Sequence, residues 1–160
     1  MRKFILLFAF IALTIADQAS KLAVQANFKL FDSVEVIPNL FNLTYVLNPG
    51  AAFGIFNTQS ETFRQIFFVA VTLVAVVLIL WMLRKEYAFV LRSVAYTMII
   101  AGAMGNLIDR IRVGMVVDFL DFYFKDFHWY TFNVADVYIT TGVGLLLIDM
   151  LIFDRKRRKR

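Results

Sequence analysis

The sequence of 160 residues contains no cysteine, a single histidine and two prolines. Without cysteine, the chain can form neither a disulfide nor a thiolate metal site. The one histidine is His128, so a zinc site that needs several histidines is excluded, and so is a Ser-His-Asp triad on any other histidine. Carboxylates therefore remain the most available groups for chemistry, and we expect no metal and no other cofactor.

Hydrophobic residues, by contrast, are abundant, since they make up 61% of the chain and include 18 phenylalanines. A soluble domain is usually about 45–50% apolar. Four apolar stretches each have about 20 residues, which is enough to cross a hydrocarbon core of about 30 Å. These stretches lie at residues 4–24, 61–83, 89–108 and 134–153. We predict an α-helical integral membrane protein with four transmembrane helices in a single domain over residues 1–160.

The first stretch follows Arg2 and Lys3, and it therefore resembles a secretory signal peptide. A cleavable leader should precede a soluble protein, whereas three more apolar stretches follow here. We expect an uncleaved first helix.

Two longer segments connect the apolar stretches. Residues 28–57 contain two short runs of β-forming residues, with a break after Pro38 and a turn that ends at Gly50, and they predict a small extracytoplasmic β-region. Gly54 adds a further flexible point. Residues 109–133 are rich in aromatic side chains, which prefer the headgroup level of a membrane, so we predict an interfacial segment there.

The distribution of charge predicts an orientation. With the N-terminus inside, eleven lysines and arginines fall on the inner side, six of them in the tail at residues 155–160, and six fall on the outer side. The positive-inside rule favours both termini in the cytoplasm. Nine of the twelve acidic residues fall in the outer half, so we expect any chemistry at the outer face. Because the basic tail follows a hydrophobic helix, we expect its partner to be the phospholipid bilayer and not nucleic acid.

Two of the outer acids, Asp118 and Asp136, lie at the edges of apolar segments. A charge at bilayer depth costs about 2.5–3.5 kcal/mol on insertion scales, so such a residue is a candidate for function. Asn133 is suited to cap the fourth helix, which would place Asp136 at its third position. If the two carboxyl groups meet, they cannot both ionise easily and they share a proton. That arrangement is typical of an aspartic protease, in which one acid activates water and the other protonates the substrate.

The end of the third stretch carries Asn106, Asp109 and Arg110, which share one helical face because they lie three and four residues apart. An acid at a helix C-terminus needs compensation. We expect Arg110 or Arg112 to form an ion pair with Asp109. Gly105 forms a small-residue pair with Ala101 that allows another helix to approach closely.

The end of the first stretch carries Asp17 and Lys21, which are four residues apart in the favourable acid-first order. We expect an ion pair here, with support of the substrate site as the alternative. His128 is expected to be an interfacial residue.

Five motifs in this order resemble those of lipoprotein signal peptidase, the bacterial signal peptidase II, and the resemblance covers nearly the whole chain. They are Asp17-Gln18-x-Ser20-Lys21, Asn48-x-Gly50-x-Ala52-Phe53-Gly54, Gly105-Asn106-x-x-Asp109-Arg110, Val117-Asp118-Phe119 and Phe132-Asn133-x-Ala135-Asp136.

The resemblance implies a membrane aspartic endopeptidase of the bacterial cytoplasmic membrane, which removes the signal peptide from diacylglyceryl-modified prolipoproteins. It implies that Asp118 and Asp136 are the catalytic pair and that the cyclic peptide globomycin inhibits the enzyme. The motif positions that it implies as support for the site or the substrate are Asn48, Gly50, Gly54, Gly105, Asn106, Asp109, Arg110, Asn133 and Ala135, to which we add Asp17 and Lys21.

A small transporter and a structural membrane subunit are the alternatives. A transporter predicts acids near the middle of the spans, whereas the stretches at 61–83 and 89–108 lack them there. A structural subunit leaves the pair of Asp118 and Asp136 unexplained.

Overall fold

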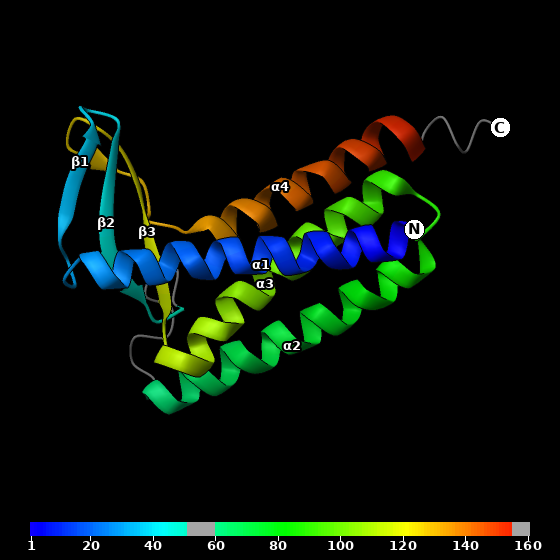
Figure 1. Ribbon diagram of the computed structural model, residues 1–160, viewed down its shortest axis with the longest axis horizontal. Helices are drawn as coiled ribbons and strands as arrows, with labels where there is room; N and C mark the ends of the chain where they lie inside the picture. The colour runs from blue at the N-terminus through cyan, green and yellow to red at the C-terminus, as the bar shows by residue number, and fades with distance from the viewer. Residues whose placement is uncertain (51–59, 155–160) are drawn as a thin grey trace.

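A computed structural model describes residues 1–50 and 60–154, and four long helices dominate these residues (Figure 1). They are α1 (Arg2–Asn27), α2 (Glu61–Lys85), α3 (Val90–Val113) and α4 (Val134–Ile148), and α4 continues as a short π-helix, η2 (Asp149–Asp154). All four are long and apolar enough to cross a membrane. The predicted four-helix membrane fold is therefore confirmed.

The helix ends follow from local sequence. Ser60 caps α2 by accepting a hydrogen bond from the Phe63 backbone. Gly114 ends α3 in the left-handed conformation, with φ of 81°, which glycine adopts without steric cost. Asn133 and Asp136 form a reciprocal capping box at the start of α4, so the predicted capping role of Asn133 is confirmed.

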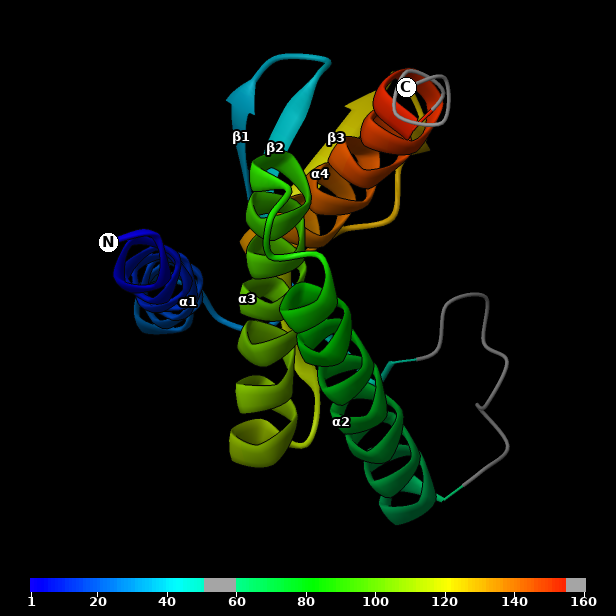
Figure 2. The same ribbon diagram turned by 90° about the vertical axis from the view of Figure 1, so that its right-hand side faces the viewer.

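The central element is α3, which packs against α1, α2 and α4. Figure 2 shows α1 and α2 on either side of α3. In the most apolar 18-residue stretch of α3, 67% is buried inside the protein, whereas in that of α2 only 6% is buried. Such a large exposed apolar surface on α2 requires lipid around it, because a soluble protein rarely exposes contiguous apolar surface of this extent.

A close approach of α3 and α4 depends on glycine. A Cβ atom on Gly142 would lie 2.7 Å from the backbone oxygen of Ala95, and one on Gly102 would lie 2.3 Å from the backbone oxygen of Ala135. Backbone atoms cannot move aside as a flexible side chain can. The two helices can therefore pack at this distance only because these positions lack a side chain.

Gly142→Ala is expected to lower the free energy of unfolding by about 1–3 kcal/mol, the usual cost of overpacking. Gly144→Ala is the matched control on the same helix, since no described atom lies within 4 Å of a Cβ atom there. We expect this control to be neutral or slightly stabilising, because alanine favours helix more than glycine. Denaturation of the detergent-solubilised protein measures both, and equal losses would contradict the role of Gly142.

A small antiparallel sheet lies at the end of the helix bundle opposite the N-terminus and η2 (Figure 1). Its strands are β1 (Ser33–Ile37), β2 (Phe41–Asn48), β3 (Val116–Phe124) and β4 (Phe127–His128), in that spatial order. The turn after Ile37 contains Asn39 with φ of 58°, so the predicted break between two strands is confirmed. Gly54 and the rest of 51–59 lie outside the described residues.

Strand β3 is a difference from the sequence analysis, which predicted an interfacial segment at 109–133 without a strand. Residues 116–122 pair with β2, and Asn48 lies opposite Val116. The first four residues of β3 are all buried, so the alternation that reveals a half-exposed strand is absent. Val117 and Phe119 pack against Val24 and Tyr45 in a small core, which attaches the sheet to α1.

Candidate active site

Asp118 on β3 and Asp136 in the first turn of α4 are held by the same residue, Asn133. The Asn133 side-chain amide donates to Asp118 Oδ1 at 2.6 Å. The Asn133 backbone N–H donates to Asp136 Oδ2 at 3.2 Å, and Asn133 Oδ1 accepts from the Asp136 backbone at 3.0 Å. The structure therefore links the two acids through one side chain, as a consequence of the capping box that starts α4.

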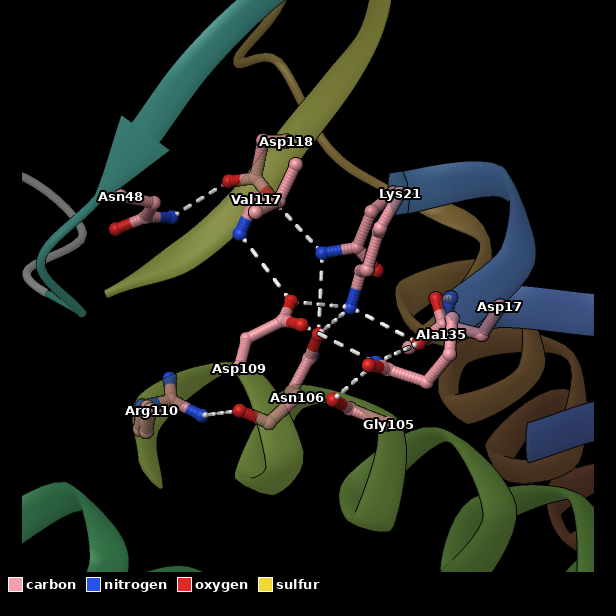
Figure 3. Close-up of polar contacts among 12 residues, drawn as sticks. Asp17, Lys21, Asn48, Gly105, Asn106, Asp109, Arg110, Val117, Asp118 and Ala135 are labelled. Atoms are coloured by element: carbon pink, nitrogen blue, oxygen red, sulfur yellow. Dashed lines mark hydrogen bonds and ion pairs between the residues drawn. The ribbon is translucent and has the colours of Figure 1, made fainter. Parts of the chain in front are cut away.

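Two further asparagines complete the surroundings of the acids. Asn48, at the end of β2, donates to Asp118 Oδ2 at 2.9 Å (Figure 3). Its own oxygen accepts from the Gly50 backbone at 2.8 Å, and Gly50 has φ of 94°, a conformation that other residues rarely adopt. Asn106 on α3 donates to Asp136 Oδ1 at 2.8 Å. Both acids are thereby fixed in orientation.

The pKa of the Asp118 carboxyl is raised from 3.8 to about 7. Burial is the main cause, because the side chain is 1% exposed and the charged form loses its water. The neighbouring charge of Asp136 acts in the same direction, whereas the hydrogen bonds from Asn48 and Asn133 act against it. Near neutral pH, Asp118 therefore holds a proton in a large fraction of molecules.

A buried cluster of charges centred on Lys21 of α1 lies beside Asp118 (Figure 3). Its ammonium group lies 3.0 Å from Asp17 Oδ2 and 2.8 Å from Asp109 Oδ2, and it donates to Asn106 Oδ1 at 2.9 Å. Lys21, Asp17 and Asp109 are all fully buried. One cation thus compensates two anions that are shielded from solvent, and the predicted pair of Asp17 and Lys21 is confirmed.

The expectation that Arg110 or Arg112 pairs with Asp109 is confirmed for Arg112 alone, and the closest partner of Asp109 was not predicted. Its close partner is Lys21, and the Arg112 guanidinium lies 3.9 Å away and is 38% exposed. Arg110 instead donates to the backbone oxygen of Asn106 at 3.3 Å. Arg110 and Arg112 are neighbours of Asp109 on the same helix. The packing of α1 against α3, however, places Lys21, which is far away in the chain, next to Asp109.

The two acids of the Lys21 cluster also hold the backbone beside the candidate pair. Asp109 Oδ2 accepts from the Val117 N–H at 3.2 Å, and Asp17 Oδ1 accepts from the Ala135 N–H at 2.9 Å. Val117 precedes Asp118, and Ala135 precedes Asp136. The charges around Lys21 therefore position both chain segments that carry the candidate acids.

Gln18 is a member of this cluster to which the sequence analysis assigned no role. Its side-chain amide donates to Asp17 Oδ2 and Asp109 Oδ1 at 3.1 Å each, and to the Gly105 backbone oxygen at 3.0 Å. The position of Gln18 in the first of the five motifs was the sequence signal that could have indicated a role at the site. Gly105 is required for α1 and α3 to lie this close together, because a Cβ atom on residue 105 would lie 2.3 Å from Asp17 Oδ2.

Two other features are the position of His128 and the groups that could hold a metal ion. His128 lies 3.0 Å from both oxygens of Asp121 and stacks on Tyr123, so it belongs to the sheet. In residues 1–50 and 60–154 there is no group of three or more histidine, cysteine or acidic side chains able to hold a metal ion.

A groove of about 430 Å³ opens beside Asp136. Its wall consists mainly of apolar and aromatic side chains from the segment before α4 and from the first turns of α4, and it is lined by Trp129, Tyr130, Thr131, Phe132, Asp136, Val137, Thr140 and Thr141. One of the two acids is therefore accessible from a largely apolar groove.

Comparison with known proteins agrees with this geometry. A family model described as signal peptidase (SPase) II matches residues 9–152. The lipoprotein signal peptidase of Syntrophus aciditrophicus is 43% identical over 154 residues, which cover 94% of this chain and 96% of that protein. That of Geobacter metallireducens is 45% identical over 146 residues, which cover 91% of this chain and 89% of that protein.

Solved structures share the fold. A structure described as a bacterial membrane enzyme at 1.9 Å resolution matches with a TM-score of 0.83 and 34% identity, covering 92% of this chain and 93% of that chain. A second, at 2.3 Å resolution, matches with a TM-score of 0.81 and 34% identity, covering 91% and 87%. Since the family model spans most of the sequence and the relatives match over most of their length, the chain belongs to the signal peptidase II family.

Proposed function

We propose that this chain is a membrane aspartic endopeptidase that cleaves the signal peptide from diacylglyceryl-modified prolipoproteins, with Asp118 and Asp136 activating a water molecule. The observation that carries the proposal is the attachment of both carboxyl groups to Asn133, together with the pKa of about 7 at Asp118. An acid that keeps its proton near neutral pH, held next to a second carboxyl group, is suited to general acid–base catalysis without a metal.

The roles of the two acids follow from their surroundings. Asp118 is buried and holds the proton, which it donates to the carbonyl oxygen or leaving nitrogen of the substrate. Asp136 lies in the first turn of α4, where the helix dipole favours a negative charge, and it takes a proton from the attacking water. The hydroxide equivalent adds to the peptide carbonyl carbon, and the C–N bond then breaks as the nitrogen is protonated.

The remaining site residues support this pair in the proposal. Asn48, Asn106 and Asn133 orient the carboxyl groups, while Lys21, Asp17 and Asp109 hold the neighbouring backbone. Gly50, Gly105 and Ala135 allow the close approach of these elements, and Arg110 is proposed to contact the substrate. Gly54, outside the described residues, keeps the supporting role that the resemblance implies.

The surface around the acids suits a substrate that enters from the lipid phase. The groove beside Asp136 is mostly apolar, and large hydrophobic side chains on the sheet and the segment after it are exposed, among them Phe124, Phe127 and Trp129. Aromatic side chains favour the membrane interface. The named relatives are lipoprotein signal peptidases, which supports a lipoprotein substrate at this site. A globomycin-type inhibitor at the same site stays a proposal that rests on the resemblance alone.

We propose the orientation that the charges favour, with both termini in the cytoplasm and the acids at the outer face of the bacterial cytoplasmic membrane. The N-terminus and η2, the last element described, lie at one end of the bundle and the sheet lies at the other (Figure 1), as an even number of spans requires.

Purified protein is expected to cleave a diacylglyceryl-modified prolipoprotein and to leave the unmodified form intact. Mass spectrometry of the products measures both the extent and the position of cleavage, which should precede the lipid-bearing cysteine of the substrate. Equal cleavage of the two forms would contradict the proposed substrate class, and no cleavage of either would contradict the proposed activity.

The activity is expected to depend on pH as a bell-shaped curve. Because Asp118 must be protonated to donate, the rate should fall as pH rises through about 7. Because Asp136 must be ionised to accept, the rate should also fall in acid. Measurement of kcat/KM across pH, with unfolding followed at each pH as a control, tests this. A rate that stays constant or rises well above neutral pH would contradict a required protonated carboxyl.

A further inference from the structure

An apolar groove of about 440 Å³ lies between α1, α2 and α3, away from the candidate acids. It is lined from α1 by Leu7 and Phe10, from α2 by Leu80, and from α3 by Thr97 and Met104. Figure 2 shows how α1 and α2 diverge on the two sides of α3, which leaves this groove along the face of the central helix.

The groove runs along the helices and has a polar end and an apolar end. Lys3 and Tyr87 line the end near the N-terminus, and Phe10 lies seven residues further along α1. At 1.5 Å per residue, the groove extends about 10 Å into the bundle. Lys3 and Lys21 are 18 residues apart on the same helix, so the groove entrance lies about 27 Å from the centre of the Lys21 cluster.

The polar end of the groove carries positive charge. Arg2 donates to the backbone oxygen of Tyr87, and its guanidinium lies 4.0 Å from the centre of the Tyr87 ring. The Lys3 ammonium lies 5.9 Å from the same ring. None of the ion pairs within residues 1–50 and 60–154 involves Arg2 or Lys3.

Two acids at this end of the bundle whose side chains the structure describes, Glu86 and Asp149, are already engaged. Glu86 lies 2.8 Å from Arg92 and accepts a hydrogen bond from Tyr96 at 2.6 Å. Asp149 lies 2.5 Å from the same arginine. Among the side chains that the structure describes, no carboxylate pairs with the cations at the groove entrance, so they are available to a headgroup.

We propose that this groove is a binding site for an anionic phospholipid, with an acyl chain between α1, α2 and α3 and the phosphate at Lys3 and Arg2. An apolar groove within a bilayer is filled by hydrocarbon, because an empty one loses dispersion contacts on every wall. Cations at the headgroup level select lipids of negative charge. The site is separate from the substrate groove beside Asp136 and does not depend on the proposed peptidase activity.

The test is native mass spectrometry of the purified protein after exchange into micelles that contain phosphatidylglycerol or phosphatidylcholine. Leu7→Trp and Leu80→Trp fill the groove from two helices, and both side chains are partly exposed, at 54% and 44%, so the fold can accommodate them. Leu22→Trp, at a side chain 49% exposed on α1, is the matched control. Lys3→Gln removes a cation at the entrance, and Lys29→Gln removes one at an exposed position near the sheet.

The wild-type protein and both controls are expected to retain one phosphatidylglycerol in preference to phosphatidylcholine. The groove-filling variants should lower retention of phosphatidylglycerol by at least about tenfold, since losing even two buried methylene groups has that effect. Lys3→Gln should reduce the preference for phosphatidylglycerol by about fivefold.

Unchanged retention in whichever groove-filling variant remains folded by thermal unfolding would overturn the site. Equal retention of the two lipids by the wild type would overturn its anionic selectivity. A bound mass that corresponds to a second protein copy would overturn the lipid as occupant.

Discussion

Replacing Asp118 or Asp136 with asparagine is expected to reduce cleavage of diacylated prolipoprotein by about 10²–10⁴-fold, the usual range for a general acid or base. Asparagine preserves the size of each side chain but can neither accept nor donate the transferred proton in the required way. Since the two acids act on one water and one peptide bond, the double variant should be hardly less active than either single variant. Initial rates with purified variants in matched detergent measure the effect.

Asp121→Asn is the matched control, because Asp121 is a buried acid on the same strand β3. It pairs with His128 at 3.0 Å and accepts from Thr44 at 3.1 Å, and neither interaction involves the candidate pair. We expect cleavage close to the wild-type rate. Cleavage near that rate in the variant of Asp118 or of Asp136 would contradict the dyad, and a large loss in Asp121→Asn would show that the effect is not specific to it.

Lys21→Met is expected to lower the free energy of unfolding by about 3–5 kcal/mol, the usual cost of removing one partner from a buried ion pair. The substitution leaves Asp17 and Asp109 fully buried without the cation that lies 3.0 and 2.8 Å from them. The released carboxylates also hold the backbone beside Asp118 and Asp136, so cleavage should fall together with stability. Denaturation of the detergent-solubilised protein and cleavage rates at low temperature measure the two effects.

A second substitution separates the charge from the packing. In Lys21→Met combined with Asp109→Asn, only one buried carboxylate remains uncompensated, so we expect part of the lost stability to return. The Val117 N–H loses a charged acceptor, so cleavage should stay low. Lys29→Met, at an exposed lysine, should change neither quantity. A Lys21→Met protein as stable as the wild type would contradict the role of Lys21.

The membrane fold could be predicted from sequence because its signals are local. An apolar stretch of about 20 residues forms a helix in a bilayer whatever its neighbours are, since only a helix satisfies its own backbone there. The capping box at Asn133 and Asp136 was predictable for the same reason, because both partners lie in one helical turn.

Strand β3 could not be predicted in the same way. Its first four residues are all buried, so this part of the strand shows no alternation of apolar and polar side chains. Its pairing with β2 brings together residues about 70 positions apart. That pairing is what places Asn48 against Asp118.

In the candidate site, too, some features follow from the local sequence and others depend on tertiary packing. The sequence by itself determined which residue types were present for chemistry, since the absence of cysteine and of a second histidine left carboxylates at the ends of apolar helices. Only the tertiary structure decided that Lys21 compensates both Asp17 and Asp109, and that Asn133 holds Asp118 and Asp136 together. The physical reason is separation along the chain. A burial cost or a helix cap acts within a few residues. A buried charge, by contrast, is compensated by whichever partner the packing of separate helices brings within hydrogen-bonding distance.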